Sequence, residues 1–195
     1  MLAQDSSGDI YSFDPRVGSV QSGNVVWTDI GLPQRDYEHL VWWKSAGKVV
    51  GVDNDGTETD GRVILYDVDI AKRADGLIGV IAGLHNIQGI AAAGDTLYAV
   101  EKGGDERLYR IDVAHKRFIL AGSTSSTAHA GIVPGTLCYH SGRLLAIANR
   151  TGTNAPILVE LNRSTGGVSE IGGTLAFGTA STIQSMAEHR GLLYY

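Results

Sequence analysis

A pattern of short strands recurs four times along the chain, and this internal repeat limits the possible folds more than any other feature. In the clearest copy, residues 87–91 are followed by runs at 96–100, 108–112 and 118–122. Each run is rich in β-branched or aromatic residues and is bounded by Gly, Asp or Ser. Runs of this kind predict β-strands, so one copy predicts four consecutive antiparallel strands, named A to D in chain order.

Glycine marks the turn between strands A and B in every copy. The turn glycines are Gly47, Gly94, Gly142 and Gly191, at intervals of 47, 48 and 49 residues. A four-stranded unit of this length is typical of one blade of a β-propeller. A β-sandwich is the alternative, but a sandwich does not require a pattern that recurs four times. We therefore expect an all-β fold, a β-propeller of four-stranded antiparallel blades, in a single domain over residues 1–195.

The two ends of the chain share one copy of the repeat. Residues 192–195 begin a strand B, and residues 1–4 resemble the rest of it. With the ends joined, Gly191 and Asp14 lie 18 residues apart, which matches the spacing in the clearest copy. The sequence thus predicts four blades with a seam inside the first. The expected blades are residues 1–33 with 180–195, 36–84, 85–124 and 133–178.

Three arrangements of these blades stay open. One chain can close a four-bladed ring, two chains can form a homodimer that completes an eight-bladed ring, or the residues can belong to a longer parent chain. Either closed ring removes an exposed sheet edge that would otherwise promote aggregation. The chain as given starts without the basic and apolar segments of a signal peptide, and no apolar run approaches the ~20 residues of a membrane helix. We expect no membrane span, and the sequence leaves the localisation open.

Composition excludes several classes of protein. A single cysteine, Cys138, excludes a disulfide framework and a cysteine-based zinc site, and its place on a predicted inner strand suggests burial. The net charge of -5 argues against a nucleic-acid partner. Trp42 and Trp43 are adjacent on a predicted strand A, so they face opposite sides of the sheet, and both are expected to pack between blades.

The runs Ile-Gln-Gly-Ile-Ala, Gly-Asp-Thr-Leu-Tyr-Ala-Val and Arg-Leu-Tyr-Arg-Ile-Asp of the clearest copy resemble blades of the β-propeller superfamily of the quinoprotein-like and TolB-like kind. The resemblance covers the whole chain, but it is architectural. It implies the propeller fold and no single activity, because these families include lectins, lactonases, lyases, cyclotransferases and scaffolds. No Trp-Asp dipeptide ends a strand C, so the G-protein-β type of propeller is not matched.

Loop placement in a propeller selects candidate binding residues. The D–A and B–C loops emerge at one end of the ring, here called the top end, and three histidines fall in D–A loops near the axis. Converging imidazoles can bind a transition metal, with a glutamine or Glu38 completing the shell, although solvent-facing loop histidines are the simpler interpretation. Tyr37 can stack on a sugar or on a partner side chain. The candidate ligand-binding residues are Tyr37, Glu38, His39, His85, Gln88, His129 and Gln184.

A second candidate site lies in the B–C loop at residues 53–61. Its four carboxylates, Asp53, Asp55, Glu58 and Asp60, fall within eight residues, and such a density of hard oxygen ligands suits Ca²⁺. The loop lacks the twelfth-position Glu of an EF-hand, and a solvated turn is the alternative. The sequence requires no cofactor; calcium and a transition metal are the candidates.

Motifs for nucleophilic or phosphate chemistry are absent from the sequence: there is no nucleophile elbow, Walker loop or zinc-protease helix. The sequence therefore favours a non-catalytic recognition or structural β-propeller. Such a protein would bind a protein or glycan partner, or assemble with another chain, through its loop faces. The alternative is a metal-dependent lyase or hydrolase with a histidine-lined site at the top of the central channel.

Overall fold

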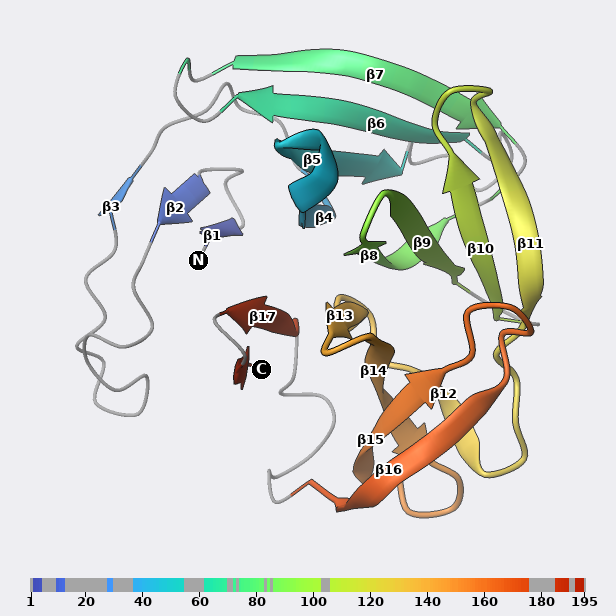
Figure 1. Cartoon of the computed structure of the whole chain (residues 1–195). Coiled ribbons are helices and arrows are strands. Elements are labelled where there is room, and N and C mark those ends of the chain that lie inside the picture. Colours follow the sequence, from blue (N-terminus) through green and yellow to red (C-terminus); the bar gives the residue numbers. More distant parts are fainter. Residues whose placement is uncertain are drawn as a thin grey trace.

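Antiparallel strands make up nearly all of the regular structure in this computed structural model (Figure 1). It describes residues 2–4, 10–12, 28–29, 37–54, 62–69, 72, 74–82, 84, 86–102, 106–175, 185–189 and 192–194. Within these residues the helical structure is one 3₁₀ turn, η2 (Lys44–Ala46), which ends at Gly47 in the left-handed conformation. The predicted all-β fold is confirmed. None of the described segments forms a helix of the length and apolarity needed to cross a membrane.

Three sheets each hold consecutive antiparallel strands in chain order. Sheet I consists of β4 (His39–Trp43), β5 (Lys48–Asn54), β6 (Arg62–Asp69) and β7 (Ala74–Ala82). Sheet II consists of β8 (Ile87–Ala93), β9 (Thr96–Glu101), β10 (Arg107–Asp112) and β11 (Arg117–Ser123). Sheet III consists of β12 (His129–Ile132), β13 (Cys138–His140), β14 (Arg143–Arg150), β15 (Pro156–Leu161) and β16 (Val168–Thr174), with β12 and β13 both paired to β14.

Two smaller sheets contain the strands nearest the ends of the chain. One is formed by β1 (Leu2–Gln4), β2 (Ile10–Ser12) and β3 (Thr28–Asp29), and the other by β17 (Ala187–His189) and β18 (Leu192–Tyr194). Figure 1 shows the sheets placed around a common centre, with β4, β8, β13 and β17 on the inner side and β7, β11 and β16 on the outer side. Consecutive antiparallel sheets of four or five strands, each with an early strand innermost and its last strand outermost, fit the arrangement expected of propeller blades.

The hydrophobic core lies between the faces of neighbouring sheets. Sheets I and II enclose a cluster that includes Val50, Leu65 and Leu97, and a second cluster between sheets II and III includes Leu108 and Leu144. Sheets II and III each bury both faces, because alternate residues of one strand enter different clusters. Burial on both faces explains why the strands are nearly continuous apolar runs instead of alternating ones.

Glycines allow the outer strand of one sheet to approach the β-turn of the next. A Cβ atom on Gly122 of β11 would lie 1.8 Å from the carbonyl oxygen of Thr165, in the turn between β15 and β16. One sheet earlier, a Cβ atom on Gly79 of β7 would lie 3.4 Å from Cε of Lys116, in the turn between β10 and β11. The same kind of intersheet contact therefore occurs at two successive junctions, and Gly122 makes the closer approach.

Cys138 is buried, as the sequence suggested. Burial, with a smaller contribution from the negative charge of Glu188, raises the pKa of its thiol to about 12. Because the thiolate is the reactive form, we predict that the native protein does not react with a thiol reagent at pH 8, whereas the unfolded chain reacts fully. Absorbance with Ellman's reagent, with and without denaturant, measures this. Rapid stoichiometric labelling of the native protein would contradict the burial of Cys138.

Trp42 and Trp43 face opposite sides of sheet I, as alternation predicts. Trp43 packs against the core between sheets I and II. Trp42 is 57% exposed, so the prediction that it packs between blades is wrong. It lies on the sheet I face that is turned away from sheet II, and the buried cluster on that face is small: Tyr37, Val49, Tyr66 and Val68.

Candidate functional site

The structure describes five of the seven predicted ligand-binding residues: Tyr37, Glu38, His39, Gln88 and His129. His85 and Gln184 lie outside the described residues, as do three members of the predicted calcium loop, Asp55, Glu58 and Asp60; Asp53 is described at the end of β5. In the described part of the chain, no three His, Cys, Asp or Glu side chains come together in a way that could hold a metal ion.

Tyr37 lies in the core of sheet I. Its ring covers Gly51, where a Cβ atom would lie 2.5 Å from Cδ1 of the ring, and it makes an edge-to-face contact with Tyr66. The phenol donates a hydrogen bond to Oδ2 of Asp75 at 2.5 Å. Only 5% of the Tyr37 surface is exposed, and the residue belongs to the small buried cluster on the sheet I face that is turned away from sheet II. The next residue, Glu38, is exposed, and its backbone N–H donates to the carbonyl of Val52.

His39 connects sheet I to sheet II. It is the first residue of β4, and its Nε2 lies 3.0 Å from the carbonyl oxygen of Ile87, the first residue of β8. Nε2–H of a neutral imidazole donates this bond. Burial lowers the pKa of His39, and the bond to Ile87 opposes that shift in part. At neutral pH the side chain is therefore an uncharged link between two sheets.

Glu106 connects sheet II to sheet III. Its carboxylate, just before β10, accepts the backbone N–H of Ile132 in β12, at 3.2 Å to Oε1 and 3.1 Å to Oε2. Oε1 also accepts a hydrogen bond from Nε2 of Gln88 in β8 at 3.1 Å. Gly131 makes this approach possible, because its φ is 133° and a Cβ atom there would lie 2.8 Å from Oε1. One carboxylate thus joins three strands of two sheets.

His129, at the start of β12, lies two residues before Gly131, whose Cβ position is next to this carboxylate. Its side chain is buried, with 6% of the residue exposed, and neither ring nitrogen forms a hydrogen bond. Burial lowers the pKa of His129, while the negative charge of Glu106 opposes the shift. The imidazole is therefore neutral at pH 7. We call the group Gln88, Glu106, Thr124, His129 and Ile132 the II–III junction.

Sequence reasoning selected two members of the II–III junction, Gln88 and His129, and missed Glu106 and Thr124. Thr124 is fully buried, and both its backbone N–H and its hydroxyl donate to the Glu106 carbonyl at 2.8 Å. Glu106 is one of several acids in a polar loop, and no local pattern distinguishes it from the others. One sequence signal was available: a polar residue within or next to an apolar strand pattern is expected to be buried and to need a hydrogen-bond partner. In the structure, the described buried polar residues are Gln88, Thr124, His129 and Thr136.

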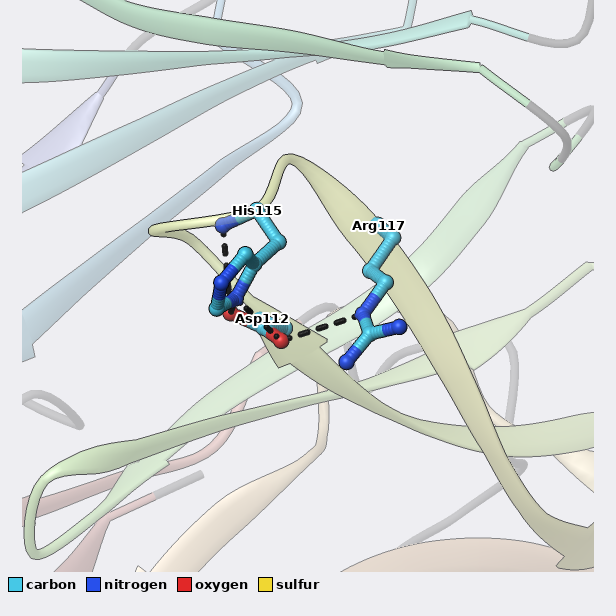
Figure 2. A network of polar contacts seen from close by, with 3 residues as sticks. All are labelled: Asp112, His115 and Arg117. Carbon is cyan, nitrogen blue, oxygen red and sulfur yellow. Dashed lines mark hydrogen bonds and ion pairs between the residues drawn. The ribbon is translucent and has the colours of Figure 1, made fainter.

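At the end of the sheets opposite to the top end, polar contacts stabilise turns. Figure 2 shows Asp112 accepting hydrogen bonds from the backbone N–H and Nδ1 of His115 and from Nε of Arg117. These bonds, those of His115 first, lower the pKa of Asp112. His115 is largely exposed, so this network orders the turn between β10 and β11 and encloses no site.

The strand order and the intersheet bonds together define the class: an all-β chain of consecutive antiparallel sheets, most of four or five strands, with a propeller-like arrangement. A solved structure of the same class is similar to it, TolB from Acinetobacter baumannii, with a TM-score of 0.51 and 12% sequence identity. The match covers 95% of this chain and 42% of the TolB chain, so this chain spans less than half of that structure. The predicted TolB-like fold is thereby supported. No protein-family model and no curated protein sequence matches the chain.

Proposed function

We propose that this chain is a non-catalytic β-propeller scaffold that recognises a protein partner. The observation that supports this proposal is that the described polar side chains at the top end form hydrogen bonds between neighbouring strands and sheets. His39 bonds to Ile87, while Glu106 accepts hydrogen bonds from Gln88 and Ile132. Catalytic acids and bases must reach a substrate, whereas these side chains use their hydrogen-bonding capacity to hold neighbouring sheets together.

A four-bladed ring closed within one chain is the arrangement that we propose for this scaffold. The β1–β3 and β17–β18 sheets would form one blade, since β18 and β1 occupy the two parts of a strand B in the repeat. β1 and β17, one strand of each of these sheets, lie on the inner side of the molecule (Figure 1). Light scattering is expected to give a monomer mass. A stable dimer would instead favour the eight-bladed ring shared between two copies.

Exposed apolar side chains favour a protein as the partner. Trp42, Leu77 and Val80 are 57%, 62% and 41% exposed, and all three lie on the sheet I face that is turned away from sheet II. In the closed ring the inner part of this face adjoins the blade that contains β1–β3, so the part left for a partner is at the outer strand β7, with Leu77 and Val80. Large apolar side chains gathered on one face are typical of protein–protein contacts.

Site-specific photo-crosslinking tests this surface. A photoreactive phenylalanine replaces Leu77 or Val80, and the control position is Leu120 of β11, which is 56% exposed outside this face. We expect one adduct of defined mass from the two sheet I positions in an extract of the source cells, and its loss when the other of these two residues is replaced by serine. Equal labelling from Leu120, or no adduct from sheet I, would contradict the proposal.

Elemental analysis separates this function from the metal-dependent alternative. We expect the purified protein to contain no stoichiometric transition metal, and His39→Ala to leave its metal content unchanged. A bound metal that is lost in His39→Ala would contradict the scaffold proposal. It would favour instead a lyase or hydrolase with a histidine-lined site.

A further inference from the structure

The carboxylate of Glu106 links the strands that meet at the II–III junction. Glu106 accepts hydrogen bonds from Ile132 of β12 and from Gln88 of β8. The junction has a second intersheet contact, from the N–H of Gly135 to the Gln88 carbonyl at 2.7 Å. Because Ile132 is itself buried, its N–H depends on Glu106 for an acceptor.

His129 is the titratable group of β12, the strand whose Ile132 N–H this carboxylate accepts. Of the other charged side chains around it, Arg150 of β14 lies opposite His129 in register, but its guanidinium is ion-paired with Glu170 of β16. Arg107, next to Glu106, acts on the phenol of Tyr109, which donates to Glu101 of β9, and Gln88 on β8 is uncharged. Glu106, whose carboxylate lies against Gly131 two residues along the strand, is therefore the anion whose charge acts on the His129 ring, without a direct ion pair between them.

We propose that the II–III junction is an acid-sensitive joint, in which protonation of His129 withdraws Glu106 from Ile132 and Gln88. An imidazolium has two N–H donors, and a charge-assisted bond to a carboxylate is stronger than a bond from a neutral amide. If Glu106 turns to His129, the amides of Ile132 and Gln88 lose their acceptor. If Glu106 stays in place, a positive charge remains buried without a hydrogen bond. Both outcomes weaken the contact between sheets II and III.

The direction of the pH effect follows from the burial of the ring. Burial lowers the pKa of His129 in the folded protein, so the unfolded chain binds this proton more tightly. The stability that the neutral imidazole contributes is present above the ordinary pKa of about 6.5 and is lost progressively as the pH falls from that value through the lower pKa of the folded protein. The joint belongs to the fold, so this proposal holds whether or not a partner binds sheet I.

Amide hydrogen exchange at Ile132 reports on the joint directly. Wild-type protein, His129→Gln and His115→Gln are compared at pH 7.5 and 5.0, with rates corrected for intrinsic exchange. We expect protection at Ile132 to fall about tenfold or more on acidification in wild type and in His115→Gln, because His115 is exposed at the other end of sheet II. His129→Gln should keep its protection. The thermal midpoint of wild type should also fall by about 2–4 °C more than that of His129→Gln.

Parallel loss of protection in wild type and His129→Gln would overturn the proposal. Glu106→Gln provides an independent test, because its amide oxygen can still accept the Ile132 N–H but carries no negative charge. Without that charge the imidazolium is less stable, so the loss of Ile132 protection should move to lower pH. An unchanged pH midpoint in Glu106→Gln would also overturn the proposal.

Discussion

Replacing Gly122 by alanine should destabilise the protein by about 3 kcal/mol or more. The added methyl group would lie 1.8 Å from the Thr165 carbonyl oxygen and 3.2 Å from the backbone nitrogen of Gly166. Both are backbone atoms of a tight turn, so they cannot rotate away as a side chain would. For a chain of this size we expect the thermal midpoint to fall by about 6–12 °C, which differential scanning calorimetry measures.

Gly76→Ala is the matched control for Gly122→Ala. Gly76 also lies in an outer strand, β7, but a Cβ atom there would have no neighbour within 4 Å, and its φ is not positive. We expect its stability to remain within about 0.5 kcal/mol of wild type. If Gly122→Ala and Gly76→Ala unfold at the same temperature, β11 does not approach the turn between β15 and β16 as closely as described.

The repeat predicted the sheets well because the sequence signals for their strands and turns lie close together in the chain. Strand patterns and turn glycines such as Gly94 and Gly142, both with positive φ, specify antiparallel pairing between neighbours in the chain. The prediction was less accurate at the start of the blade expected at residues 133–178, because β12 (His129–Ile132) precedes that start and β13 begins only at Cys138. Pro134 has no N–H to donate, Gly135 has a φ of 79°, and the Thr136 hydroxyl takes over bonds to the backbone of Val133 and Ile147.

The candidate site was harder to predict because its contacts join distant segments. Residue type and loop position selected Gln88 and His129, but Glu106 is recognisable only when its neighbours across the junction are known. Tyr37 shows the same limit: its aromatic ring suggested stacking on a ligand, whereas a glycine on β5 provides a place for the ring in the core. Alternation predicted the direction of Trp42 correctly, but the sequence does not reveal which faces a neighbouring sheet leaves uncovered.

Replacing Glu106 by alanine should destabilise the protein by about 3 kcal/mol, because two donors lose a charged acceptor at once. The Ile132 N–H is buried and has both carboxylate oxygens within 3.2 Å, while the Gln88 amide lies 3.1 Å from Oε1. Loss of the negative charge also lowers the pKa of His129 further, since Glu106 now stabilises its protonated form. Chemical denaturation measures the loss of stability.

Glu170→Ala is the control for the loss of a carboxylate from sheet III. Glu170 pairs with Arg150 at a partly exposed position, where ion pairs contribute little, so we expect only a small change. Glu106→Gln should lie between wild type and Glu106→Ala, because the amide oxygen replaces the acceptor for one donor. In Glu106→Ala, hydrogen exchange should show a loss of protection at the Ile132 amide. If Glu106→Ala proved as stable as Glu170→Ala, the carboxylate would not hold sheets II and III together.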